Sequence, residues 1–175
     1  MRRVAYMSLL LALGVAGCDD SPVDPSNDTI PTFTAALTTA NEVPPVMSVE
    51  AICTGNVTIR ITNLTRNSAQ VITAATVDFT GNVANCPANT SINFGHIHPG
   101  AVGVVGDFVV NTGLAPGVLV LVNGSGSFVQ NGRRPERNDF TIIQRMLDNP
   151  MGFYFNLHST LHPDGVIRGQ LIRTQ

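Results

Sequence analysis

The chain has 175 residues, of which 43% are hydrophobic and 13% charged, and its formal net charge is −2. This length and composition are ordinary for one globular domain and give no sign of a second core. The sequence contains no lysine, which excludes the phosphate-binding Gly-x-x-x-x-Gly-Lys loop. Its arginines form no basic stripe of the kind that binds nucleic acid, so no nucleic-acid partner is expected.

Residues 1–17 are predicted to be an export signal and not part of the fold. Arg2 and Arg3 precede an apolar run over residues 4–13, which is too short to span a bilayer. The Val-Ala-Gly-Cys sequence that ends at Cys18 resembles a bacterial lipobox. An ordinary secretory signal with an incidental cysteine is the alternative. The lipobox interpretation makes Cys18 the lipidated N-terminus and attaches the mature protein to a membrane.

Residues 18–30 are polar, contain proline and lack periodicity, so they are predicted to be a flexible tether. The folded domain is expected to occupy residues 31–175. This organisation predicts a bacterial cell-envelope protein, with its domain facing the periplasm or the exterior. The sequence does not distinguish the inner from the outer membrane, and it does not indicate an oligomeric state.

Two cysteines remain after Cys18 is assigned to the lipid. Cys53 and Cys86 are expected to form a disulfide, because disulfides persist in exported proteins. Metal ligation is the less favoured alternative, since neither cysteine has a second one close by. In the chain-entropy model a bridge of this loop length stabilises the fold by roughly 4 kcal/mol.

The rest of the chain reads as a series of short strands separated by turn residues. Alternating apolar and polar residues, bounded by glycine, proline and asparagine, predict strands at residues 32–37, 52–61, 71–79, 92–98, 107–110, 118–122, 124–130, 152–158 and 164–171. Gly81 and Asn82 are expected to end the third of these strands. Pro163, Asp164 and Gly165 indicate a turn between the last two.

A single helix is predicted at residues 139–148, where apolar residues recur at helical spacing. Asn138 is the expected N-cap, and Asn149 followed by Pro150 ends the helix. One short helix among many short strands predicts an all-β protein, an antiparallel Greek-key β-sandwich.

The four histidines fall into two groups, each at a strand end. His96 and His98 should leave the same face of a strand, with Cα atoms roughly 7 Å apart. His158 and His162 lie beside the later turn. If the two turns meet, three or four imidazoles can bind one copper or zinc ion. The alternative is that the histidines hydrogen-bond the turns and hold the strand ends together.

Four motifs occur in a fixed order, at residues 41–46 (NEVPPV), 96–100 (HIHPG), 155–159 (FNLHS) and 162–171 (HPDGVIRGQL). Together they resemble the chordin-type CHRD domain, over roughly residues 31–173. The resemblance implies an all-β domain of a kind found in many bacterial envelope proteins. Gly95 departs from the family pattern, in which alanine commonly precedes the first histidine.

These features predict a membrane-anchored binding or structural module that can hold one metal ion and contact a protein partner in the envelope. The His-x-His strand with a distant histidine also resembles copper/zinc superoxide dismutase, which implies a copper-dependent redox enzyme as the alternative. The zinc loop of that family is not found, and no residue is assigned a catalytic role. Arg168 lies within a strand and is expected to pair with Glu42 or Asp164 as a structural ion pair.

Overall fold

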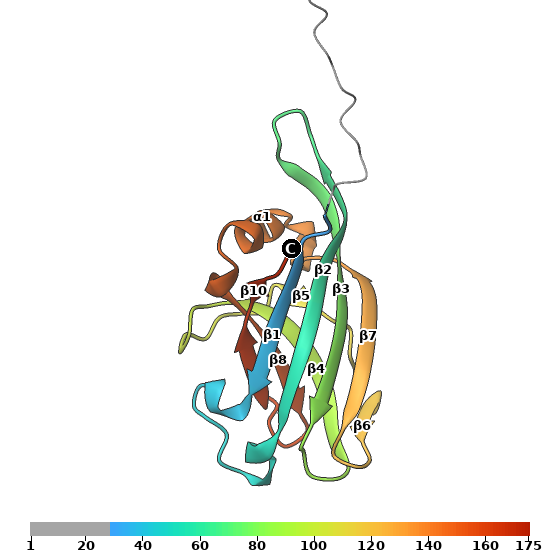
Figure 1. Ribbon diagram of the computed structural model, residues 1–175, viewed down its shortest axis with the longest axis vertical. Helices are drawn as coiled ribbons and strands as arrows, with labels where there is room; N and C mark the ends of the chain where they lie inside the picture. Colours follow the sequence, from blue (N-terminus) through green and yellow to red (C-terminus); the bar gives the residue numbers. More distant parts are fainter. Residues whose placement is uncertain (1–28) are drawn as a thin grey trace, which may run out of the picture.

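In the computed structural model, residues 29–175 are described, and they form an all-β fold with one short α-helix, as the sequence predicts (Figure 1). The predictions for Cys18, the export signal and most of the tether lie outside these residues. Within residues 29–175, no helix has the length and apolar character needed to cross a membrane.

The strands are β1 (Thr32–Thr38), β2 (Thr54–Arg66), β3 (Ile72–Ala84), β4 (Thr90–Pro99), β5 (Val110–Asn111), β6 (Leu119–Leu121), β7 (Gly126–Arg133), β8 (Phe153–Ser159), β9 (Ile167–Gln170) and β10 (Ile172–Arg173). The helix α1 spans Thr141–Asp148. Short 3₁₀ helices are η2 (Thr39–Asn41), η3 (Val49–Ile52), η4 (Glu136–Asn138) and η5 (Pro150–Gly152).

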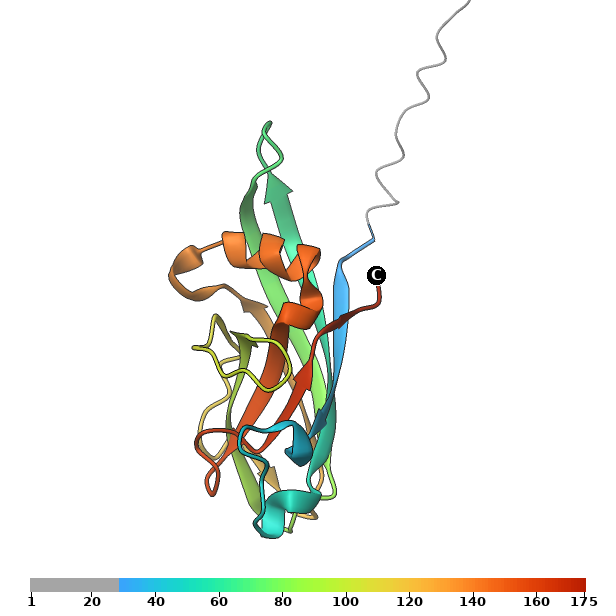
Figure 2. The same ribbon diagram turned by 90° about the vertical axis from the view of Figure 1, so that its left-hand side faces the viewer.

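All of these strands belong to one antiparallel sheet with the order β5-β4-β8-β9-β1-β2-β3-β7. The short strands β6 and β10 pair with β4 and β1. The sheet folds over on itself, so that β1, β2, β3 and β7 lie across from β8 and β4 (Figures 1 and 2). Because β9 pairs with both β8 and β1, the two layers are continuous.

The hydrophobic core lies between the two layers, and strand alternation decides which residues enter it. On β1 the buried Phe33 and Leu37 point inward, and on β4 and β8 the inward residues include Ile97, Phe155 and Leu157. Every residue of β8 is buried. The outer face of β8, which points away from the core, is therefore covered as well. The residues of β4 and β8 that alternate with the core residues point toward this covered outer face.

Several predicted boundaries are wrong. The strand expected at residues 107–110 begins only at Val110 and ends at Asn111, and the strand expected at residues 52–61 runs on to Arg66. Strand β3 does not end at Gly81 but runs on to Ala84, because Gly81 lies under the ring of Phe128 on β7 and leaves room for it. Asn138 does not cap the helix. The Asp139 carboxylate accepts a hydrogen bond from the backbone N–H of Thr141, where α1 begins.

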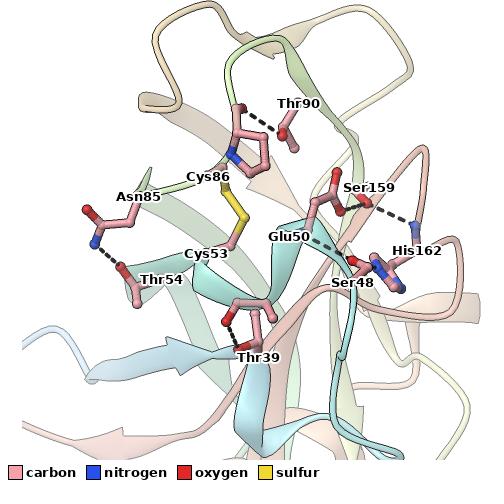
Figure 3. The surroundings of a disulfide bond; sticks show 12 residues. Thr39, Ser48, Glu50, Cys53, Thr54, Asn85, Cys86, Thr90, Ser159 and His162 are labelled. Carbon is pink, nitrogen blue, oxygen red and sulfur yellow. Dashed lines mark hydrogen bonds between the residues drawn. A yellow bond between two sulfur atoms is a disulfide. The ribbon is translucent and has the colours of Figure 1, made fainter.

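The predicted disulfide between Cys53 and Cys86 is confirmed (Figure 3). It joins the end of η3 to the loop that follows β3, and both cysteines are buried. The bridge therefore fixes the long connection between β1 and β2 against the end of the β2–β3 hairpin.

Candidate metal centre

Three of the four histidines converge on the outer face of the layer that contains β4 and β8. His96 and His98 are two residues apart on β4 and share this face, while Ile97 between them points into the core. His158 on β8 stands opposite Phe94, which shares the face of His96. One nitrogen atom from each of the three rings lies within 4.8 Å of the others. We call His96, His98 and His158 the histidine cluster.

Backbone carbonyls hold the far nitrogen atoms of two of these rings. The Nδ1 atom of His98 lies 2.8 Å from the oxygen of Gly106, and Nδ1 of His158 lies 2.8 Å from the oxygen of Pro163. Because a carbonyl oxygen only accepts hydrogen bonds, both Nδ1 atoms carry the proton and both Nε2 atoms are unprotonated, each with a lone pair that can accept a hydrogen bond or bind a metal. Carbonyl partners of this kind orient metal-binding histidines.

The near nitrogen atoms face one another. Nδ1 of His96 lies 3.1 Å from Nε2 of His158, so His96 donates a hydrogen bond to the lone pair of His158. Nε2 of His98 is buried and has no hydrogen-bond partner within residues 29–175. A buried lone pair without a donor is unfavourable, and a metal ion at the centre of the cluster would satisfy it.

Aromatic rings enclose the cluster. Phe108, from the loop over residues 100–109, stacks on His96 with ring centroids 4.5 Å apart, and Phe94 lies 6.1 Å away. Tyr154 stacks on His98 at 4.8 Å, with the two rings nearly parallel. These contacts limit rotation of the imidazoles and keep their ligand atoms in place.

Burial keeps the three imidazoles neutral. It lowers the pKa of His96 to about 3, and repulsion from protonated His158 and His98 acts in the same direction. Burial also lowers the pKa of His98 to about 4, although its hydrogen bond to Gly106 opposes the shift. The pKa of His158 is lowered too, again mainly through burial. Neutral imidazole is the form that binds metals, so binding of an ion at neutral pH releases no net proton from these three residues.

The donor set fits a borderline metal ion. Three neutral imidazoles without a carboxylate or thiolate suit Zn²⁺ or copper and do not suit Mg²⁺ or Ca²⁺, which prefer oxygen ligands. Three protein ligands would leave a coordination position for water or another small molecule.

His162, the fourth predicted ligand, does not join the cluster. Its Nε2 atom lies 2.6 Å from Oγ of Ser48, and its backbone N–H donates to Oγ of Ser159. The Ser159 hydroxyl in turn donates to the carboxylate of Glu50 in η3. The turn after β8 thus directs His162 toward η3 and the nearby disulfide (Figure 3). The expected set of four ligands is therefore reduced to three.

Arg168, predicted to form an ion pair with Glu42 or Asp164, donates its hydrogen bonds to backbone carbonyls instead. Its Nη2 atom donates to the carbonyls of Ala101 and Val104, at 3.1 and 2.7 Å. The guanidinium carbon lies 3.4 Å from the centre of the Tyr154 ring. The charge of Arg168 nevertheless reaches Glu42 and lowers its pKa in part.

Glu42 lies buried near Arg168 and Asn156. Burial raises its pKa to about 7, against the charge of Arg168 and a hydrogen bond with Asn156, which both lower it. Oε1 of Glu42 and Oδ1 of Asn156 have no hydrogen-bond partner within the described part of the chain. Asn156 pairs with His96 in the sheet, so this second polar group adjoins the histidine cluster.

Sequence reasoning did not identify the surroundings of the cluster. Phe94 could have been found, because the alternation that places His96 and His98 on one face places Phe94 there as well. The carbonyls of Gly106 and Pro163 could not, since their positions depend on the path of two loops. Gly95, where the family commonly has alanine, is explained by packing: a Cβ atom there would lie 2.8 Å from the Leu157 side chain.

Comparison with known proteins supports the resemblance that the four motifs indicate. The CHRD domain model matches residues 33–171, which include strands β2 to β9, all of β1 except Thr32, and the whole histidine cluster. Neither the curated proteins nor the solved structures contain a match to the chain. Because the matched segment covers most of the sequence, the chain belongs to the CHRD domain family.

Proposed function

We propose that this protein is a metal-binding module of the bacterial cell envelope that holds one copper or zinc ion through His96, His98 and His158. The observation that supports this most strongly is the convergence of three buried, neutral imidazoles, with the buried Nε2 of His98 left without a partner. An unsatisfied buried polar atom costs about 1–3 kcal/mol, so folding these groups together without a ligand is unfavourable. Coordination of an ion would remove that cost.

A purely structural role is the competing explanation. His98 and His158 both bond to carbonyls of loops, and these bonds would hold the loops whether or not an ion binds. On that explanation, His96→Ala would lower stability without changing the metal content. The protein would then act as an adhesion or scaffold module with a protein partner in the envelope.

Elemental analysis separates the two explanations. Residues 29–175 would be purified without a tag from a periplasm supplied with copper and zinc, beside the His96→Ala/His98→Ala variant. We expect about one ion per chain in the wild type and none in the variant, since one imidazole alone is a poor site. His162→Ala is the matched control and should keep its ion, because His162 bonds to Ser48 and lies outside the cluster. A wild type without metal would refute the proposal.

A copper-dependent redox enzyme of the superoxide dismutase kind is a second candidate. The observation in its favour is that the cluster supplies three protein ligands, which leaves a coordination position open. Redox activity should then require copper and disappear in the His96→Ala/His98→Ala variant. Activity that survives removal of the metal would exclude this candidate.

Attachment to a membrane rests on the lipobox sequence at Cys18. Cys18→Ala should move the protein from the membrane fraction to the soluble fraction without changing its metal content. An unchanged distribution would argue for an ordinary secretory signal.

A further inference from the structure

Arg168 is almost completely buried, yet it lies on the same covered face as the histidine cluster, not in the core. It is 2% exposed and pairs across the sheet with Asn156 on β8 and with Thr38 on β1. Burying a guanidinium is costly unless its donors and its charge are satisfied. Its contacts therefore indicate what the residue does.

The hydrogen bonds of Arg168 hold the loop that covers the histidine cluster. Nη2 donates to two carbonyls of this loop, those of Ala101 and Val104. The Nε2 atom of Gln170, two residues further along β9, donates to the carbonyl of Gly100, at the start of the same loop. Two side chains of β9 thus fix residues 100–104 against the sheet.

The Tyr154 ring connects Arg168 to His98. The guanidinium lies over the ring at 3.4 Å from its centroid, and the imidazole of His98 stacks on the same ring at 4.8 Å. The Tyr154 hydroxyl accepts a hydrogen bond from the backbone N–H of Gly106, at 3.3 Å. Gly106 is also the residue whose carbonyl accepts the bond from Nδ1 of His98.

We propose that Arg168 is a positioning residue for the metal site: it fixes the 100–106 loop and the Tyr154 ring, and so holds the Gly106 carbonyl where it keeps Nε2 of His98 directed at the ion. This inference rests on the proposed metal-binding function. Arginine suits the role because its planar fork can bond to carbonyls while it lies flat on an aromatic ring, which a lysine ammonium cannot do.

The backbone of Gly106 packs so closely against the end of β4 that a small displacement of the loop would change the contact with His98. A Cβ atom on Gly106 would overlap the carbonyl oxygen of Pro99, so Gly106 lies as close to the end of β4 as a backbone can. If Arg168 no longer held residues 101 and 104, the loop would be free to move away from β4, and the bond to His98 would lengthen. The imidazole could then rotate about its stacking contact with Tyr154.

The test compares Arg168→Gln and Arg168→Lys with Arg133→Gln in the full chain. Arg133 is a matched control, since it is partly buried and its Nε donates to the carbonyl of Asn111, outside the 100–106 loop. The first readout is the Nδ1–H signal of His98 in ¹⁵N–¹H spectra of the metal-free protein. The second is the dissociation constant for Zn²⁺, measured by chelator competition.

We expect Arg168→Gln to lose the slowly exchanging His98 signal and to weaken zinc binding by about ten- to a hundred-fold, the usual effect of removing support behind a metal ligand. Arg168→Lys should fall between Arg168→Gln and the wild type, and Arg133→Gln should match the wild type. If Arg168→Gln does not fold, Arg168→Lys decides by the same two readouts.

Two results would overturn the proposal: a folded Arg168→Gln protein with a wild-type His98 signal, or equal weakening of zinc binding in Arg133→Gln. Failure of the underlying function would look different. If the wild type bound no zinc but Arg168→Gln still lost the His98 signal, the metal site would be refuted, while the role of Arg168 in orienting His98 would stand.

Discussion

Nδ1 of His96 lies 3.1 Å from Nε2 of His158, although 62 positions separate the two residues in the chain. The pairing of β4 with β8 brings them together, because Phe94 and His158 stand opposite each other and His96 is the next residue on that face. The bond between these two imidazoles occupies the nitrogen atoms that would bind an ion. Metal binding must therefore replace it.

Zinc binding should change the tautomer of His96 alone. In the metal-free protein His96 donates through Nδ1, so this atom must lose its proton to become a ligand, and the proton moves to Nε2. His98 and His158 already carry their protons on the Nδ1 atoms that face carbonyls. Long-range ¹H–¹⁵N spectra during a zinc titration should show this switch. A change of tautomer at His98 or His158 would contradict Nε2 as the ligand atom of these two residues.

The metal-free protein should lose stability as the pH falls from about 6.5 to about 4. In the unfolded chain the three histidines bind protons near their ordinary pKa of 6.5, whereas folded His96 and His98 stay neutral until about pH 3 and about pH 4. The unfolded state thus binds more protons in this range, and each such histidine contributes about 1.4 kcal/mol per pH unit. Above about pH 6.5 the histidines are neutral in the unfolded chain as well, so they no longer lower the free energy of unfolding.

Urea denaturation at pH 7, 6 and 5 measures the effect. The control is His96→Gln/His98→Gln, whose free energy of unfolding should depend less on pH because it lacks two of the buried imidazoles. Wild-type stability that does not change between pH 7 and pH 5 would show that the cluster is protonated or open to water in the folded state.

Glu42 should have the opposite dependence on pH. Its pKa rises from 4.5 to about 7 on folding, so the folded state holds a proton that the unfolded state releases, and stability falls as the pH rises through this range. Glu42→Gln keeps the shape without the charge. It should unfold like the wild type at pH 4 and be more stable by about 3 kcal/mol at pH 8. An equal difference at both pH values would mean that Glu42 is ionised in the fold.

The strands could be predicted from the sequence because alternation and turn residues are local signals. The positions of β1, β4 and β8 follow from their apolar residues and from the glycines and prolines beside them. The paired faces of His96 and His98 follow from the same alternation. The boundary at Gly81 was wrong because that glycine makes room for Phe128, a contact between residues far apart in sequence.

The composition of the site could be predicted only in part, for a related reason. Four histidines in two groups suggest a common centre, but which of them meet depends on the path of the turn after β8. That turn directs His162 to Ser48, a partner more than a hundred residues earlier in the chain. The role of Arg168 was likewise hidden, because its acceptors are backbone carbonyls, which every residue carries.

His162→Ala should lower stability without reducing the metal content. The substitution removes the hydrogen bond to Ser48, which holds the turn after β8 against the segment before η3, and a net loss of about 1 kcal/mol is expected for one such bond. Denaturation measures the loss, and elemental analysis measures the ion. His158→Ala is the comparison, since it should lose the ion. Loss of metal in His162→Ala would return that residue to the ligand set.

Removing the disulfide should destabilise the domain and leave the strands that carry the histidine cluster intact. Cys53 and Cys86 are 33 positions apart, and a loop of this size corresponds to about 4 kcal/mol in the chain-entropy model. The double variant Cys53→Ala/Cys86→Ala should unfold at a lower urea concentration, and adding a reductant should affect only the wild type. The bridge reaches the site only indirectly, through η3, whose Glu50 bonds to Ser159 at the end of β8. The zinc dissociation constant of the folded variant should therefore stay close to that of the wild type. A loss of zinc binding as complete as that of His96→Ala/His98→Ala, in a variant that is still folded, would show that the β8 end of the site depends on the disulfide.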